Sequence, residues 1–213
     1  MTITENREKD HMFSSALNAY YTLFFAETSP IGSPIVGLKG GNVTLPCQYD
    51  GSEIPDMSLI GGSESIPVCQ TEECSCRVCQ KGACDVVIKD LSFRDAGKYT
   101  LSVYHHNDHT ELEPHIRTYQ LCVHDEVSVK IDEELKLDVL VSNADEVQRQ
   151  SRRSTGWKKI WSRTEGIQSE RITIREGNLI INEFTFRDEG SYVVLDPDRN
   201  ILIMMKVRAE KLN

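Results

Sequence analysis

Cysteines gather between residues 69 and 84, where their spacing permits two kinds of chemistry. Five of the seven cysteines lie in this segment: Cys69, Cys74, Cys76, Cys79 and Cys84. In a reducing compartment, the last four of these would offer four thiolates, a set suited to zinc. In an oxidising compartment they would form disulfides instead, and Cys79 and Cys84 flank a short hairpin turn that their side chains could bridge.

The other two cysteines, Cys47 and Cys122, stand apart from this segment. Because seven is an odd number, at least one thiol must be unpaired or joined to another chain. Cys122 alternates with Leu121 and Val123, which have the inward parity of a strand, so we expect its thiol to point outward. Cys122 is therefore the candidate for the bridge of a disulfide-linked dimer.

Four of the six histidines lie between residues 105 and 115, together with Glu111 and Glu113. Imidazole and carboxylate groups at this density could bind a metal ion or sense pH. The alternative is a solvated polar loop, which we favour because loops are normally polar and exposed. We therefore expect no metal ion and no cofactor.

Sequence motifs of enzymatic catalysis are missing. The chain has no Gly-rich phosphate loop, no nucleophile elbow and no metalloprotease helix. Its 33 acidic residues outnumber 24 basic ones, giving a net charge of −9. This balance argues against a general affinity for nucleic acid or anionic membranes. We expect a binding protein rather than an enzyme.

The elements that must position these residues are indicated by a repeated segment. Phe93-Arg-Asp-Ala-Gly-Lys-Tyr99 returns as Phe186-Arg-Asp-Glu-Gly-Ser-Tyr192, each time after an alternation of apolar residues. The spacing of 93 residues matches the ~100 residues that one sandwich domain needs. A glycine can turn the chain with positive φ, and the tyrosine that follows can bury its ring and bond nearby backbone through its hydroxyl.

These motifs resemble the immunoglobulin superfamily, variable type. The run Val86 to Val103, which has no cysteine on its second strand, is also similar to the membrane-distal domain of lymphocyte adhesion receptors in the signalling-lymphocyte-activation group. The resemblance implies an all-β fold with two tandem immunoglobulin-like β-sandwiches. The expected division is a variable-type domain 1 at 30–124 and a variable-type domain 2 at 125–209. An N-terminal segment at 1–29 would precede them, and a tail at 210–213 would follow.

Immunoglobulin domains commonly join strands B and F by a disulfide whose second cysteine lies two residues after the corner tyrosine. This chain has Leu101 and Val194 at those positions. In domain 2, Val139 takes the strand-B position, so an apolar contact replaces the bridge. In domain 1, Cys47 lacks its usual partner.

The resemblance also implies an ion pair at each corner. The expected pairs are Arg77 with Asp95 and Arg171 with Asp188, holding one end of each sandwich. For Arg77, two solvated charges are an equal alternative. The remaining corner residues are Gly97, Tyr99, Gly190 and Tyr192.

A basic cluster surrounds two tryptophans in the second half of the chain. Its members are Arg149, Arg152, Arg153, Lys158, Lys159 and Arg163, with Trp157 and Trp161. Such a cluster could bind a polyanion. We favour a different interpretation, in which the arginines form the B to C loop and one tryptophan is the core residue of strand C.

By the same resemblance, recognition would use the face of domain 1 built from strands G, F, C and C′. The candidate contact residues are Thr100, Ser102, Tyr104, His106, Thr118 and Gln120. The expected partner is a protein ligand or counter-receptor on another cell, or a second copy of this chain, in an immune-receptor or adhesion role. The alternatives are a secreted soluble decoy and a zinc-binding protein that uses the cysteine cluster.

The expected location is extracellular or at the cell surface. Asn42-Val-Thr44 is a glycosylation sequon, which is used only in the secretory path. The apolar run from Ala16 to Ala26 contains Asn18 and Thr22, so residues 1–29 resemble at best a degenerate signal peptide. No segment approaches the ~20 apolar residues that a membrane helix requires.

Overall fold

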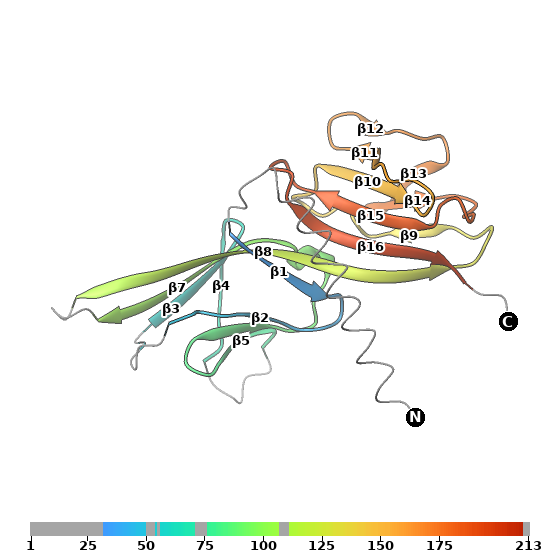
Figure 1. The fold of residues 1–213 in the computed structure, drawn as a ribbon. Helices are drawn as coiled ribbons and strands as arrows, with labels where there is room; N and C mark the ends of the chain where they lie inside the picture. Colours follow the sequence, from blue (N-terminus) through green and yellow to red (C-terminus); the bar gives the residue numbers. More distant parts are fainter. Residues whose placement is uncertain (1–31, 50–53, 55, 71–75, 107–110, 211–213) are drawn as a thin grey trace, which may run out of the picture. The chain divides into compact units, whose positions relative to one another are not determined.

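The computed structural model describes residues 32–49, 54, 56–70, 76–106 and 111–210. The first repeat contains strands β1 to β7, a short 3-10 helix and the first part of strand β8, which continues into the second repeat (Figure 1). These elements are β1 (Ser33–Leu38), β2 (Val43–Leu45), β3 (Asp56–Gly61), β4 (Glu64–Ile66), β5 (Val78–Lys81), β6 (Asp85–Ile88), η1 (Phe93–Asp95), β7 (Gly97–His106) and β8 (Leu112–Val129). We use "first repeat" for β1 to β7 with β8 up to residue 124.

The second repeat begins with the rest of β8. It continues with β9 (Leu135–Leu137), β10 (Glu146–Ser151), β11 (Lys158–Ser162), β12 (Gly166–Ile167), β13 (Ile172–Arg175), β14 (Asn178–Ile181), β15 (Gly190–Leu195) and β16 (Ile201–Ala209). The predicted domain boundary between residues 124 and 125 falls inside β8 and stays a prediction. Within the described residues, no helix has the length and apolar character needed to span a membrane.

Three sheets contain these strands. The largest has the order β12-β11-β10-β15-β16-β8-β7-β3-β4, with β1 parallel to β8. The other two are β2-β6-β5 in the first repeat and β9-β14-β13 in the second. Each smaller sheet supplies the second layer of a sandwich. The predicted all-β, immunoglobulin-like fold is confirmed.

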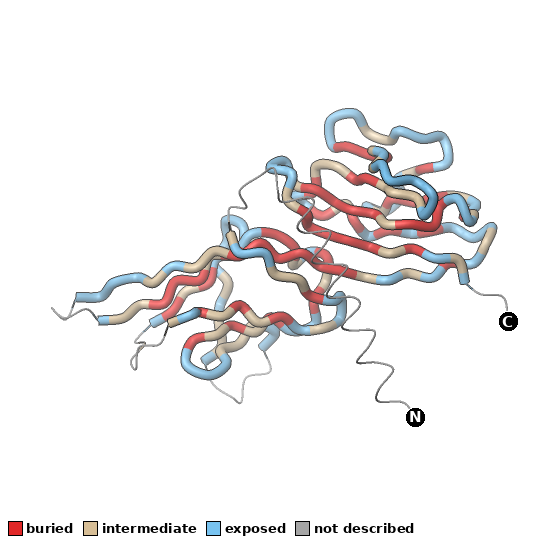
Figure 2. Tube along the Cα trace, in the orientation of Figure 1, coloured by how far each residue is buried: buried red, intermediate tan, exposed pale blue. Residues whose placement is uncertain are grey.

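Alternating burial explains why these segments pair as sheets. In β6, Val86 and Ile88 are buried while their neighbours are partly exposed, and in β9 Leu135 and Leu137 are buried on either side of exposed Lys136. Residues of one parity therefore point into the core. Figure 2 colours the trace by burial, and buried segments occur in both repeats.

The positions where a B to F bridge would lie are packed with apolar side chains. Leu101 pairs with Leu59 across β7 and β3, and Val194 pairs with Val147 across β15 and β10. All four are almost completely buried. Val139 is also buried in the core, as predicted for a sandwich without that bridge.

Strand C of the second repeat lies elsewhere than predicted. The strand that pairs with β15 is β10, which carries Arg149, and the tryptophan-bearing segment is the next strand, β11. The core residue of β10 is Val147, while Trp161 reaches the core from β11. The prediction was wrong because β10 has only one apolar side chain and resembles a loop in sequence.

Candidate recognition face

One face of the large sheet is formed by β4, β3, β7 and β8 in the first repeat, and we call it the four-strand face. Cross-strand partners place Ile60, Thr100 and Thr118 in one row. The next row contains Ser58, Ser102 and Ile116. Their neighbours along β7, Leu101 and Val103, point into the core. The strand alternation therefore presents this second set of side chains on the outer face.

The chemistry of these two rows is neutral. Hydroxyl groups alternate with two exposed aliphatic side chains, Ile60 at 40% and Ile116 at 55% exposure. Both rows lack charged side chains, and Asp56 and Lys98 lie farther along the strands. Depletion of charge around exposed apolar side chains is typical of the central part of protein interfaces.

The predicted contact residues divide into two groups. Thr100, Tyr104 and Thr118 are half-buried and His106 is exposed. Ser102 and Gln120 are buried instead, at 8% and 5% exposure. Ser102 lies between Ser58 and Ile116 on the neighbouring strands, so parity alone overestimated its accessibility. The prediction also missed Ile60 and Ile116, although Ile116 has the same parity as Thr118.

The histidines at the far end of β7 and β8 pack on an aromatic ring. His105 and His115 lie 4.9 Å and 5.7 Å from the ring of Tyr49, centroid to centroid. Arg117 Nε donates to His115 Nε2 at 3.2 Å, which requires that nitrogen to be unprotonated. The described residues contain no group of histidines placed to bind a metal ion, and His109 lies outside them.

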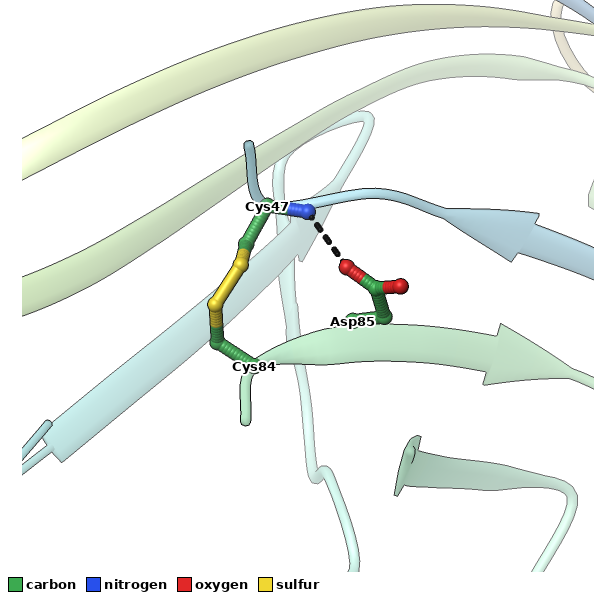
Figure 3. A group of neighbouring side chains, drawn as sticks. All are labelled: Cys47, Cys84 and Asp85. Carbon is green, nitrogen blue, oxygen red and sulfur yellow. Dashed lines mark hydrogen bonds between the residues drawn. A yellow bond between two sulfur atoms is a disulfide. The ribbon is translucent and has the colours of Figure 1, made fainter. Parts of the chain in front are cut away.

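The cysteine chemistry differs from the predicted pairing. Cys47 forms a disulfide with Cys84 (Figure 3), with 5.6 Å between the Cα atoms. The backbone amide of Cys47 also donates to Asp85 Oδ1 at 2.9 Å. The predicted Cys79–Cys84 bridge is therefore wrong. The bridge joins the end of β2 to the start of β6, adjacent strands of one sheet.

This disulfide also removes Cys84 from the proposed zinc set, because a bonded sulfur is no longer a thiolate. Cys69 is disulfide-bonded as well, while Cys76 and Cys79 retain their thiols. Cys74 lies outside the described residues. The alternative of a four-thiolate zinc site therefore does not hold in this oxidation state.

Cys122 is completely buried in β8. The sequence predicted an outward thiol able to join a second chain, and the observed burial contradicts that prediction. Alternation could not identify an exposed side here because residues of both parities are buried from Tyr119 to His124 of β8.

Both corners are held by the same contacts. Arg77 Nη2 lies 2.6 Å from Asp95 Oδ1, and Tyr99 donates its hydroxyl to the Asp95 carbonyl at 2.7 Å. In the second repeat Arg171 pairs with Asp188 at 2.9 Å, and Tyr192 donates to the Asp188 carbonyl at 2.7 Å. Burial raises the pKa of Tyr99 to about 12, so its hydroxyl stays a donor at neutral pH.

Asn42 is exposed beside the first corner. Its Oδ1 accepts a hydrogen bond from the backbone amide of Asp90 at 3.2 Å. The side-chain nitrogen, where a glycan would be attached, is not used in that contact. Glycosylation at Asn42 stays a prediction.

Comparison with known proteins found no matching family model and no matching curated protein. Solved structures do match. CD84, of the SLAM family, is 19% identical with a TM-score of 0.35, over 43% of this chain and 96% of that one. Murine CEACAM1b is 15% identical with a TM-score of 0.31, over 82% and 96%. The titin tandem A164–A165 is 14% identical with a TM-score of 0.33, over 84% and 95%.

Proposed function

We propose that this chain is a non-enzymatic recognition module that binds another protein outside the cell through the four-strand face. The observation that carries the proposal is the exposure of Ile60 and Ile116 among neutral hydroxyl side chains. Isolated exposed apolar residues are ordinary on a protein surface. Two of them in adjacent rows without charged side chains form a centre for an interface.

The expected partner is a counter-receptor on another cell or a second copy of this chain, in an adhesion or immune-receptor role. Few anchor residues on a flat polar face suit weak, transient contacts, because affinity depends on the anchors rather than on area. Residues 30–124 would form the binding domain and residues 125–209 a second variable-type domain.

The Cys47–Cys84 disulfide supports the extracellular part of the proposal. Stable structural disulfides form in oxidising compartments and are rare in the cytosol. Exposed Asn42 within its sequon is consistent with passage through the secretory path.

The test uses the whole chain, multimerised, against a panel of purified extracellular domains that includes the chain itself. Ile60→Asp and Ile116→Asp should each weaken a detected interaction at least about tenfold, because a buried unpaired carboxylate is costly at an interface. Ile174→Asp is the matched control, since Ile174 is 43% exposed on β13 of the second repeat. Tyr104→Ala and Thr118→Ala test the flanking contacts.

Interactions that survive all four substitutions on the four-strand face would refute the proposed face. Loss of binding by Ile174→Asp, with Ile60→Asp and Ile116→Asp unchanged, would move the site to the second repeat.

A further inference from the structure

A cleft of ≈ 1090 Å³ lies beside the corner of the second repeat. Its walls come from the turn between β14 and β15, from the end of β10 with the loop that follows, and from the segment before β13. Five arginines line it: Arg149, Arg152, Arg153, Arg171 and Arg187. This is a concentration of guanidinium groups in a chain whose net charge is −9.

Three of these arginines have acidic partners. Arg149 and Arg171 both pair with Asp188, at 2.9 Å each, so one carboxylate serves two cations. Arg152 pairs with Glu189 at 3.0 Å. Asp188 is only 3% exposed behind the cleft, so it cannot neutralise a ligand-facing charge as well.

The other two, Arg153 and Arg187, are exposed. Within the described part of the chain, neither guanidinium forms a hydrogen bond or an ion pair with another residue. A guanidinium presents donors in a planar fork that matches a carboxylate. Two such groups in one cleft form a site for an anionic group.

Phe186 gives the cleft an apolar contact. Its side chain is 68% exposed, whereas Phe93, the same position in the first repeat, is 3% exposed. Phe93 also lies under Lys39, whose Nζ is 4.4 Å from the ring centroid. The repeated motif therefore buries its phenylalanine in one repeat and presents it to solvent, among arginines, in the other.

We propose that this corner cleft binds an acidic peptide segment of a protein partner. A carboxylate would bind Arg153 and Arg187, and an adjacent apolar side chain would pack on Phe186. The carboxylates of Asp132 and Glu183 line the same cleft and would repel a dense polyanion such as a sulfated polysaccharide. A peptide with spaced carboxylates and apolar residues fits this mixed surface better. The inference is independent of the four-strand face and assigns a binding role to the second repeat.

The probe is a capped synthetic peptide with alternating glutamate and leucine residues, titrated into the isotope-labelled full chain. Saturable amide shifts are expected at Phe186, Arg187 and Glu189. The double variant Arg153→Ala/Arg187→Ala should lower the affinity for the peptide at least about tenfold, since charge-assisted hydrogen bonds are lost. Lys81→Ala/Arg94→Ala removes two exposed cations from the first repeat and should leave the affinity within about twofold, the size of a screened long-range effect.

A second comparison separates the chemistry from net charge. A peptide with glutamine in place of glutamate should not bind. Phe186→Ser should weaken the binding of the glutamate peptide but leave the affinity for free glutamate unchanged. The proposal would be overturned if the glutamine peptide bound as tightly as the glutamate peptide. It would also be overturned if Lys81→Ala/Arg94→Ala weakened peptide binding as much as Arg153→Ala/Arg187→Ala does. Tighter binding of a heparin hexasaccharide to the same amides would overturn the peptide assignment in favour of a polyanion.

Discussion

Arg149 Nη1 lies 2.9 Å from Asp188 Oδ1, and this ion pair ties strand β10 to the corner of the second repeat. Arg149 pairs across the strands with Tyr192, whereas the residue opposite Tyr99 in the first repeat is Gly61. The first corner therefore lacks an arginine at this position. The extra contact makes the second corner both more strongly braced and more basic.

The carboxylate of Asp188 should be the most sensitive polar group of the second corner. It accepts from Arg149 and Arg171 and from both the backbone amide and the hydroxyl of Thr185. Asp188→Asn leaves two partly buried guanidinium groups without a counter-charge. We expect a loss of about 3 kcal/mol in the free energy of unfolding, the usual cost of breaking a buried pair.

Urea unfolding of the full chain measures this loss. Asp95→Asn should cost less, because Asp95 has one arginine partner and a more exposed side chain. Asp198→Asn is the control, since Asp198 is exposed beyond β15. Equal midpoints for the Asp188 and Asp198 variants would contradict the bracing role of Arg149.

The same carboxylate predicts a loss of stability in acid. Burial alone would raise the pKa of Asp188, but hydrogen bonds from Arg171 and Thr185 outweigh it and lower the pKa below its ordinary value. The folded state therefore binds this proton less tightly than the unfolded state does. The stabilisation is complete above the unfolded pKa of about 3.9 and is lost as pH falls through the folded pKa.

Thermal unfolding between pH 6 and pH 2 tests this dependence. The melting temperature of the unmodified chain should fall below about pH 4 more steeply than that of Asp188→Asn, because the variant has no carboxylate to protonate at this position. Parallel curves for the two proteins would show that other carboxylates dominate acid unfolding.

The tyrosine contacts of the corners could be predicted from sequence because they are local, whereas the Arg77–Asp95 and Arg171–Asp188 pairs, 18 and 17 residues apart, followed from the family resemblance. Ser92 and Thr185 each lie three residues before the aspartate that their amides bond, and each tyrosine hydroxyl reaches a carbonyl four residues back. Such short-range contacts need no knowledge of strand register.

The disulfide could not be predicted in the same way. Val43 pairs with Ile88 and Leu45 with Val86, and the same register continued by two residues brings Cys47 opposite Cys84. That pairing depends on the alignment of β2 with β6, which brings together two cysteines 37 residues apart in sequence, rather than on the spacing of cysteines within 69–84. The exposed Ile60 was missed for a related reason, since β3 carried too little alternation to be assigned a face.

The two corner glycines should differ in their tolerance of a side chain. Both have positive φ, 138° at Gly97 and 149° at Gly190, so alanine is strained at either position. At Gly190 a Cβ would also lie 2.1 Å from the carbonyl oxygen of Gln150 on β10, whereas at Gly97 the nearest atom is the side-chain nitrogen of Asn143 at 3.0 Å. The Asn143 side chain can move away from a new Cβ, whereas the Gln150 carbonyl is held in the backbone of β10.

We therefore expect Gly190→Ala to cost at least about 1 to 3 kcal/mol more than Gly97→Ala, the usual range for overpacking. Urea unfolding of the two variants measures the difference. Gly177→Ala gives the cost of a positive φ of 74° without a steric clash, because its Cβ would have no neighbour within 4 Å. A Gly190→Ala variant as stable as Gly177→Ala would contradict the close approach of β15 to β10.

Peptide mapping can distinguish the Cys47–Cys84 disulfide from any disulfide formed within residues 69–84. Peptide mapping without reduction should recover Cys47 linked to Cys84, with Cys79 open to alkylation. The double variant Cys47→Ala/Cys84→Ala should lose about 3 kcal/mol, because the unfolded chain is no longer constrained by a loop of this length. Cys79→Ala should change stability by less than about 1 kcal/mol, since Cys79 is only partly buried. A linked Cys79–Cys84 peptide, or a Cys79→Ala variant as unstable as the double variant, would show that the bridge lies between β5 and β6 instead.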